Sequence, residues 1–246
     1  MKNITIITPV PDLINTFIKN SMLRKAIENK VVQVNVMNLR EYGKGKYRQI
    51  DDNPYGGGSG MLMMVEPLCN ALEHAIEQMD NSSEVVVLYP TAQGKMWNQD
   101  SAVNLSQHNN IIVICGHYKG IDERVIEKYV THEYSIGDFI MTSGELPAML
   151  MLDSAVRLIP GTLNNIESAL TDTFTYGLLD HPHYAYPRSY QNMNVPEVLI
   201  SGHHKNIDSW KQEQREKRTK ERRLDLWEKY TKLKAIELEN NNEQNS

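Results

Sequence analysis

The feature that most constrains this chain is an alternation of short β-branched runs with longer helical stretches over residues 1–158. Ile4–Ile7, Val31–Val36 and Ile111–Cys115 are runs typical of strands. Glu66–Met79 instead carries apolar residues at helical spacing. Strands interleaved with helices favour a parallel sheet that is covered on both faces. We therefore predict an α/β fold.

The same pattern predicts where the elements and the domains lie. We expect strands at 4–7, 31–36, 85–89, 111–115 and 133–136, and helices at 12–29, 66–79, 98–107, 121–129 and 145–158. Pro160 and Gly161 stop the last of these helices. We expect a first domain at 1–160, a linker at 161–173 and a second, small all-helical domain at 174–246. Within it, two helices broken near Arg223 should cover residues 206–234, before a disordered tail at 240–246.

The charge distribution separates these two parts. Residues 1–200 hold 15 Lys and Arg against 22 Asp and Glu, whereas residues 201–234 hold 11 against 6. A net charge of -5 would not steer the whole chain toward a nucleic acid, so any polyanion contact should be local to the basic segment. A solvated helix of mixed charge is the alternative interpretation.

Neither a membrane nor a disulfide framework is expected. The apolar runs fall far short of the roughly 20 residues that cross a bilayer, and the N-terminus lacks the features of a signal peptide. We expect a cytoplasmic protein. Cys69 and Cys115 are too few for a disulfide framework, have no partner at metal-ligand spacing and should be small buried apolar residues.

Three loops that follow strands are candidates for a binding site, because ligands of α/β sheets bind beyond the carboxyl ends of the strands. They are residues 89–95, 115–124 and 135–145, and each contains glycine. None matches a dinucleotide-binding or P-loop motif. The Gly56–Gly60 cluster could be a phosphate cradle, but it lacks the lysine of a P-loop. The alternative is a flexible loop. We expect one pocket that holds its ligand through neutral backbone groups.

Several long motifs in one order resemble the bacterial tRNA (guanine-N1)-methyltransferases of the TrmD type, members of the SPOUT class. The likeness is colinear over about residues 1–230. The matching segments are 51–61 (Asp-Asp-Asn-Pro-Tyr-Gly-Gly-Gly-Ser-Gly-Met), 115–124 (Cys-Gly-His-Tyr-Lys-Gly-Ile-Asp-Glu-Arg), 135–138 (Ser-Ile-Gly-Asp), 144–149 (Gly-Glu-Leu-Pro-Ala-Met), 157–161, 178–184 and 198–204.

This resemblance implies a parallel sheet with a deep trefoil knot and S-adenosylmethionine bound by the three loops. The implied cofactor-binding residues are Tyr89, Gln93, Gly116, Tyr118, Ile136, Gly137, Asp138, Phe139, Ile140, Met141 and Gly144. For the isoleucines and Met141 the alternative role is core packing, and for the glycines it is turn geometry. Asp138 would orient the cofactor or the base, or else cap its loop.

The catalytic positions implied by the resemblance are Asp172 and Arg157. The N1 atom of guanine carries a proton, and Asp172 matches the general base that removes it. Arg157 matches the group that stabilises negative charge on the guanine carbonyl oxygen. Their alternatives are a helix N-cap for Asp172 and a contact with the helix C-terminus for Arg157. In the family the base reaches the cofactor of the other subunit, which implies a homodimer with its active site at the interface.

Five positions depart from the family pattern. His117 and Lys119 stand where most members have Arg and Glu, and since that Glu is linked to a magnesium requirement, Lys119 argues against a metal. Ala92 and Ser143 replace a usual proline and glycine, and Ser59 replaces a common proline in the Gly-rich loop.

The implied activity is methylation of N1 of the guanosine at position 37 of tRNA, 3′ of the anticodon. The basic segment 211–223 would bind tRNA phosphates. Methylation of another RNA site and a non-catalytic RNA-binding role are the alternatives, and the second is favoured only by His117 and Lys119.

Overall fold

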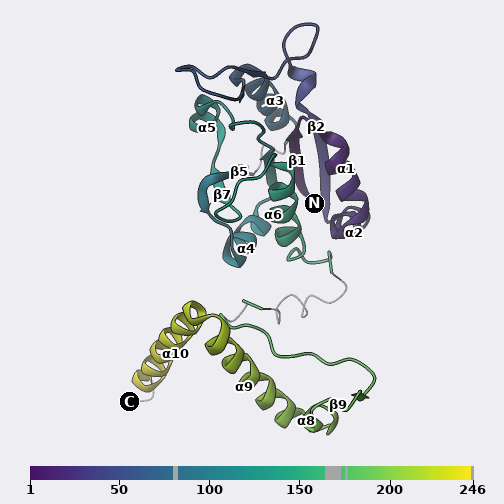
Figure 1. The fold of residues 1–246 in the computed structure, drawn as a ribbon, viewed down its shortest axis with the longest axis vertical. Coiled ribbons are helices and arrows are strands. Elements are labelled where there is room, and N and C mark those ends of the chain that lie inside the picture. The colour runs from purple at the N-terminus through teal and green to yellow at the C-terminus, as the bar shows by residue number, and fades with distance from the viewer. Residues whose placement is uncertain (80–82, 164–172, 175–176, 245–246) are drawn as a thin grey trace. The chain divides into compact units, whose positions relative to one another are not determined.

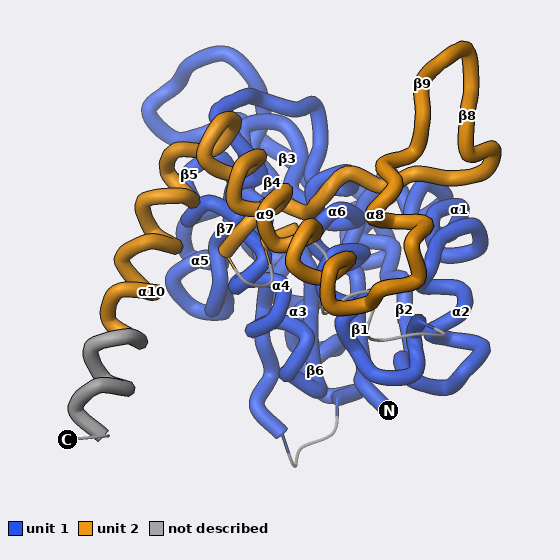
Figure 2. The backbone as a smooth tube through the Cα atoms, turned by 90° about the horizontal axis from the view of Figure 1, so that it is seen from below, with its two compact units in different colours: residues 1–166 blue, residues 167–246 orange. Residues whose placement is uncertain are grey.

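The computed structural model describes residues 1–79, 83–163, 173–174 and 177–244, which divide into two compact units, 1–166 and 167–246 (Figure 2). Most of the expected linker at 161–173 lies outside the described residues. Within the described part, we find no helix with the length and apolar character to span a membrane.

Unit 1 is built on a five-stranded sheet in which every neighbouring pair is parallel, in the order β2-β1-β6-β5-β7 (Figure 1). The strands are β1 (Lys2–Thr8), β2 (Val32–Asn38), β5 (Val85–Met96), β6 (Asn110–Ile114) and β7 (His132–Ser135). The prediction of an α/β fold with a parallel sheet is confirmed.

Alternating residues of the central strands supply two cores, one on each face of the sheet. Ile4 and Ile6 of β1 belong to one core, whereas Ile7 belongs to the other, as the two-residue period of a strand requires. The first core is completed by α1 (Pro11–Asn20), α2 (Met22–Glu28), α4 (Gln99–Gln107) and α6 (Glu145–Val156), and the second by α3 (Val65–Glu77) and α5 (Glu123–Tyr129). Helices therefore cover both faces, as predicted.

Two elements differ from their predictions. The single helix expected at 12–29 is two helices, because Ser21 is extended and its side chain accepts a hydrogen bond from Leu23 N (3.2 Å), which caps α2. The strand expected at 85–89 continues to Met96, with a register shift between Pro90 and Lys95. Residues 91–94, in the middle of the loop expected at 89–95, are therefore an excursion within β5, which pairs with β7 before and after it.

Between β2 and α3 the chain forms a 3-10 helix, η1 (Leu39–Tyr42), and an antiparallel pair of very short strands, β3 (Asp51–Asp52) and β4 (Leu62–Met63). Leu39 and Ile50 are completely buried, whereas residues 44–49 between them are all exposed. This part of unit 1 is therefore a surface loop with an anchor in the core at each end.

The described part of unit 2 consists of a hairpin and helices, so the expectation of an all-helical second domain was wrong. The hairpin is β8 (Ser189–Tyr190) with β9 (Met193–Asn194), and the helices are α8 (Glu197–Ile200), α9 (His204–Arg222) and α10 (Leu224–Gln244). The break between α9 and α10 falls at Arg223, as predicted. Helix α10 continues through residues 240–244, where we expected disorder, because extending a helix that is already formed adds a hydrogen bond for each residue fixed.

Partly buried polar contacts hold the segment before the hairpin against α9. Arg215 Nε donates to Asp180 Oδ1 (3.1 Å), and Leu179 N donates to the hydroxyl of the completely buried Thr219 (2.9 Å). Asp180 Oδ2 also contacts His183 Nε2 (2.8 Å). Burial opposes ionisation of Asp180, but its hydrogen bonds and the nearby positive charges outweigh this cost and lower its pKa.

Candidate active site

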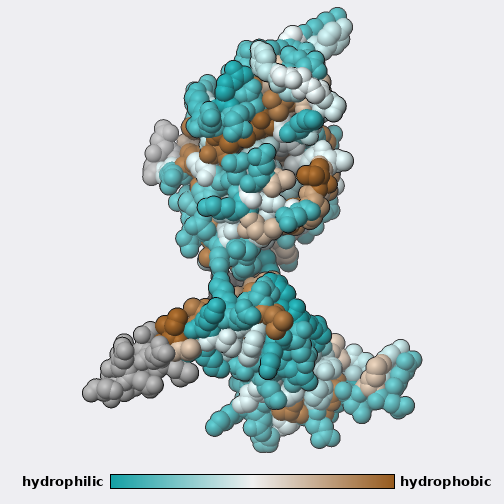
Figure 3. Space-filling model, turned by 60° about the vertical axis from the view of Figure 1, so that its left-hand side comes forward, coloured by the Kyte–Doolittle hydropathy of each residue, from teal (hydrophilic) through white to brown (hydrophobic). Residues whose placement is uncertain are grey.

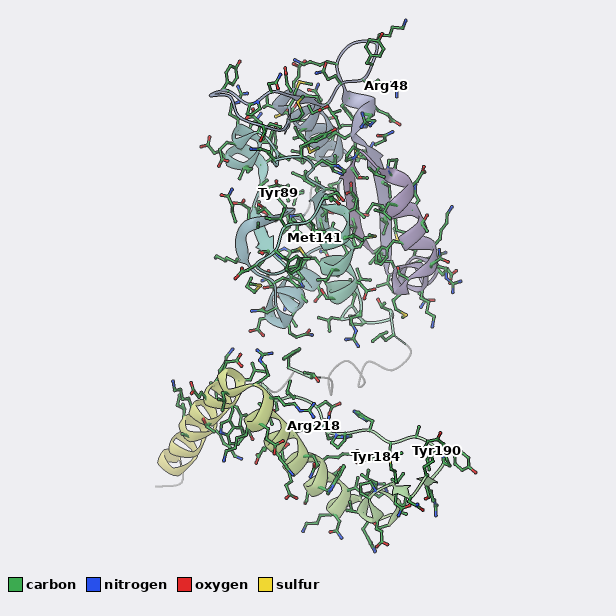
Figure 4. All side chains as sticks on the ribbon, viewed as in Figure 1. Arg48, Tyr89, Met141, Tyr184, Tyr190 and Arg218 are labelled. Atoms are coloured by element: carbon green, nitrogen blue, oxygen red, sulfur yellow. The ribbon has the colours of Figure 1, made fainter. Side chains whose placement is uncertain are left out.

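A cavity of about 290 Å³ opens at the carboxyl ends of β5, β6 and β7. Its walls come from the three loops that follow these strands or interrupt them, which is where ligands of parallel sheets bind. The lining residues are Tyr89, Pro90, Thr91, Ala92, Gln93, Gly116, His117, Tyr118, Lys119, Gly120, Tyr134, Ser135, Ile136, Gly137, Phe139, Ile140, Met141, Thr142, Ser143, Gly144 and Pro147. Figure 4 labels Tyr89 and Met141 on two of these loops.

The structure brings ten of the eleven residues expected to bind the cofactor together around this one cavity. Asp138 does not line it. Phe139 N donates to Gly137 O (3.0 Å), so Asp138 is the central residue of a three-residue turn whose neighbours face the cavity. The expectation of a single pocket thus agrees with the structure, while the binding role of each residue stays a prediction.

Of the two expected catalytic residues, only Arg157 lies in the described part of the chain, and it is not at the cavity. Arg157 is the partly buried C-cap of α6 and does not line the cavity. Its backbone N donates to Asp153 O (3.3 Å), which is the helix-end position named as its alternative role. Asp172 lies outside the described residues.

Two glycines let the loops approach more closely than other residues could. Gly144 N donates to Gly116 O (2.7 Å), and His117 and Ser143 form an antiparallel bridge beside it. A Cβ atom on Gly144 would lie 2.6 Å from Gly116 N, and one on Gly116 would lie 2.9 Å from Cε2 of Tyr89. Any side chain at Gly144 would therefore push the loops apart.

A buried carboxylate joins three segments behind the cavity wall. Glu145, the first residue of α6, is completely buried and accepts a hydrogen bond from Thr8 Oγ1 (2.6 Å). His117 Nε2 lies 2.8 and 2.9 Å from its two oxygens, and Ser143 also hydrogen-bonds to it. Burial opposes ionisation of Glu145, but these hydrogen bonds prevail and lower its pKa. This network fixes the end of β1 to two of the cavity loops.

Polar groups of the cavity wall are mostly neutral. Burial is the main cause that raises the pKa of Tyr89, which keeps its hydroxyl protonated at neutral pH. Lys119 is the exception, and a Cβ on Gly60 would lie 3.1 Å from its Cε, so Gly60 packs along the lysine stem. Lys119 N also donates to Met61 O (3.1 Å). The Gly56–Gly60 loop is therefore a neighbour of the cavity.

The two cysteines lie outside any reactive arrangement that the structure describes. Cys115 is completely buried, and burial raises the pKa of its thiol well above the usual value. Cys69 is only partly buried at the margin of the second core, so the expectation of burial was wrong for it. Its position on the edge of α3, next to the charged pair Glu73 and Lys128, explains this difference.

Asp180, His181 and His183 are a group of side chains in the described part of the chain that could hold a metal ion by ligand type and proximity. The guanidinium of Arg215 already lies 3.1 Å from the carboxylate of Asp180, and a positive charge there opposes a cation. We assign no metal to this group.

Sequence reasoning missed two members of the buried network, Thr8 and Glu145. Thr8 ends the first strand, and the rule that ligands bind beyond strand ends applies to β1 as much as to β5, β6 and β7. Glu145 follows Gly144 directly and starts a helix whose other buried residues are apolar. A carboxylate opening a buried helix is a signal that a partner is required.

Comparison with known proteins gives one consistent family. Residues 1–229 match the family model described as tRNA (Guanine-1)-methyltransferase TrmD. A relative from Clostridioides difficile named tRNA (guanine-N(1)-)-methyltransferase is 44% identical over 224 residues, covering 91% of this chain and 96% of the relative. Proteins of the same name from Listeria monocytogenes (45% identical, 92% of each chain) and Lachnospira eligens (43% identical, 95% of this chain and 98% of the relative) are similarly close.

Proposed function

This chain belongs to the tRNA (guanine-1)-methyltransferase family, and we propose on that premise that it methylates N1 of the guanosine at position 37 of tRNA, immediately 3′ of the anticodon. The methyl donor in this proposal is S-adenosylmethionine. The single observation that carries the proposal is the family match over residues 1–229, which includes all the loops of the cavity.

The cavity loops are the proposed cofactor site. Adenine offers hydrogen-bonding edges that backbone N–H and C=O groups can satisfy, and the glycine-rich walls bring such groups close to a ligand. Bound S-adenosylmethionine supplies an electrophilic methyl group on a sulfonium. The protein's tasks are then to place the guanine N1 in line with that methyl group and to remove its proton.

Magnesium does not fit this cavity. Mg²⁺ prefers carboxylate and carbonyl oxygens, and among the described residues none that lines the cavity carries a carboxylate. Lys119 adds a positive charge instead, and Glu145 is already engaged by Thr8 and His117 behind the wall. We therefore derive no step through a metal.

Asp172 is the proposed general base, and Arg157 the proposed group that stabilises charge on the guanine carbonyl oxygen. Both roles rest on the family motifs that these residues match. Asp172→Ala should retain cofactor affinity and lose turnover, with Asp172→Asn as the matched control for size. If Asp172→Ala lost cofactor affinity and turnover equally, Asp172 would not be the general base.

The finer features of the fold also belong to the proposal. We place the trefoil knot of the SPOUT class in the part of the sheet that carries the cavity. The excursion within β5 and the hydrogen bond from Gly144 to Gly116 support this placement, because the segment before α6 lies directly against the loop after β6.

A homodimer with the active site at its interface is supported by apolar surface next to the cavity. Leu146 and Leu150 of α6 are 49% and 47% exposed, and Leu13 of the neighbouring α1 is 40% exposed. Apolar surface is visible at several places on unit 1 (Figure 3). Gly144 and Pro147 at the start of α6 line the cavity, so a partner that covers this helix would complete the wall.

The cytoplasm, where tRNA is modified, is the proposed location.

Unit 2 supplies the proposed tRNA contacts. Helix α9 exposes Lys217, Lys220 and Arg222 to solvent, which suits binding of phosphates. Residues 183–194 are all exposed and include Tyr184, Tyr186 and Tyr190, whose rings can stack on unpaired bases. Figure 4 labels Tyr184, Tyr190 and Arg218 along this unit.

The experiment that tests the function measures transfer of labelled methyl from S-adenosylmethionine to two tRNA transcripts, one with guanosine and one with adenosine at position 37. Transfer to the first alone is expected. Transfer to neither transcript would refute the enzymatic function and favour a non-catalytic RNA-binding role. Equal transfer to both transcripts would refute guanosine 37 as the methylated nucleotide.

A further inference from the structure

Residues 43–49 form a short hairpin on the surface of unit 1 that the proposed chemistry does not use. Lys44 N donates to Gln49 O (2.8 Å) and Gln49 N donates to Lys44 O (3.0 Å), which closes the hairpin. Arg48 N donates to Gly45 O (3.2 Å) across the turn. The completely buried Leu39 and Ile50 anchor the chain on either side, so the hairpin has a defined position on the unit.

The hairpin keeps its shape at a cost. Arg48 has a φ of 50°, in the left-handed region, which costs a non-glycine residue about 1–2 kcal/mol. Gly43 has to be glycine in this shape, because a Cβ there would lie 2.3 Å from Arg48 O. Backbone strain at an exposed loop is a reason to look for a function, since folding alone would favour a relaxed turn.

The tip presents an aromatic ring between two cations. Tyr47 is 87% exposed and lies between Lys46 and Arg48. Within the described residues, neither cation has an ion pair, whereas Lys44 at the base is paired with Glu66. Figure 4 shows Arg48 on unit 1 well away from the cavity residues Tyr89 and Met141. The tip therefore contacts neither the core nor the cofactor cavity.

We propose that this hairpin is a second RNA-binding element, by which unit 1 contacts the substrate tRNA away from the modified guanosine. Lys46 and Arg48 bind phosphates, and Tyr47 stacks on a base or packs on a ribose. The inference rests on the proposed function, and it assigns to unit 1 a contact that the charge of the chain suggested only for unit 2.

The chemistry of the tip favours RNA over a protein partner. Residues 43–49 read Gly-Lys-Gly-Lys-Tyr-Arg-Gln and contain no acidic and no aliphatic side chain. Lysine is depleted in the buried centre of protein interfaces, whereas a cationic surface with an aromatic ring is typical of nucleic-acid binding. A tRNA is also far larger than a cavity of about 290 Å³, so most of its contacts have to lie outside it.

The test compares tRNA binding by the full-length protein with and without the tip side chains. The variants are Lys46→Ala/Arg48→Ala and Tyr47→Ala, with Tyr47→Phe as the conservative control. Lys19→Ala/Lys25→Ala removes the same charge from the exposed sides of α1 and α2 and is the matched control. Fluorescence anisotropy gives the Kd for labelled tRNA at several salt concentrations, and calorimetry gives the Kd for S-adenosylhomocysteine.

We expect the double tip variant to weaken tRNA binding roughly tenfold at about 0.1 M salt and to reduce the slope of log K against log salt by about 1.5, as loss of two phosphate contacts requires. Tyr47→Ala should weaken binding about five- to tenfold and Tyr47→Phe hardly at all. Affinity for S-adenosylhomocysteine and kcat at saturating tRNA should stay at the wild-type values.

Wild-type tRNA affinity and salt slope in the tip variants would overturn the inference, as would an equal loss in the Lys19 and Lys25 control. A loss of cofactor affinity in the tip variants would also overturn it, because the effect would then be structural. These outcomes are independent of the proposed function, which fails instead if the wild-type protein transfers no methyl group.

Discussion

The buried carboxylate of Glu145 makes the sharpest prediction about the cavity. Glu145→Gln keeps the size of the side chain and removes its charge. A hydrogen bond to a charged group contributes about 1.5–3 kcal/mol and one between neutral groups about 0.5–1.5 kcal/mol. Glu145 accepts from Thr8, His117 and Ser143. Each of these hydrogen bonds becomes weaker by about 1 kcal/mol when the acceptor loses its charge. The free energy of unfolding at pH 7 should therefore fall by roughly 2–3 kcal/mol.

The pH dependence gives this prediction its sign. The pKa of Glu145 in the folded protein lies below its usual value of 4.5. A depressed carboxyl pKa contributes stability that is present above the unfolded value and is lost as the pH falls through the folded value. The stability difference between wild type and Glu145→Gln should therefore be constant from pH 7 to about pH 5 and should shrink below pH 4.5.

The assay follows unit 1 by itself. Trp97 lies in unit 1, where its Nε1 donates to Ser154 Oγ (3.0 Å), whereas Trp210 and Trp227 belong to unit 2. In a Trp210→Phe/Trp227→Phe background, the fluorescence of Trp97 reports urea unfolding of unit 1, and the free energy of unfolding is measured from pH 7 down to pH 4.

The control is Glu28→Gln, which breaks the exposed ion pair with Arg24 and should cost less than about 0.5 kcal/mol at every pH. A loss from Glu145→Gln as small as that of the control, or one of equal size at pH 7 and pH 4, would refute the assignment of a stabilising buried charge.

Three further predictions follow from contacts in the two units. Gly144→Ala should raise the KM for S-adenosylmethionine more than tenfold or prevent folding, because its Cβ would lie 2.6 Å from Gly116 N; a folded variant with a normal KM would contradict the close approach. Cys69 should react with iodoacetamide in the native protein while Cys115 reacts only after unfolding, as peptide mass spectrometry will determine. Asp180→Ala should destabilise unit 2 by about 2–3 kcal/mol in urea unfolding followed by Trp210 fluorescence, because Arg215 and His183 both lose their shared carboxylate; a change below about 0.5 kcal/mol would contradict a stabilising role for these contacts.

The alternation of strand-like and helical segments was sufficient to predict the sheet class, because each central strand is apolar enough to be buried on both faces. Ser21 shows where that reasoning stops. A polar residue inside a helical pattern can either face solvent or cap a new helix, and the choice depends on how the two halves pack against the sheet.

The cavity could be located because glycines after consecutive strands have few other reasons to occur together. The Thr8–Glu145–His117 network could not, because its members come from three distant places in the chain, and the local partners of Thr8 and Glu145, Val10 N and Ser143, do not indicate the distant ones. Asp138 shows a related limit. Its neighbours on both sides line the cavity, but a turn at that residue removes it from the wall, and turn geometry is not visible in the residue type alone.

The strand order also has a consequence for how this chain is synthesised. Strand β1 can pair with β2 once both have left the ribosome, but its other edge waits for β6, which begins 72 residues after the end of β2. At roughly 5–20 residues per second, that wait lasts about 4–14 s. During it, an unpaired edge carrying Ile4 and Ile6 is open to other chains. We expect nascent chains stalled between β2 and β6 to aggregate or to recruit chaperones, and those stalled after α6 to remain soluble.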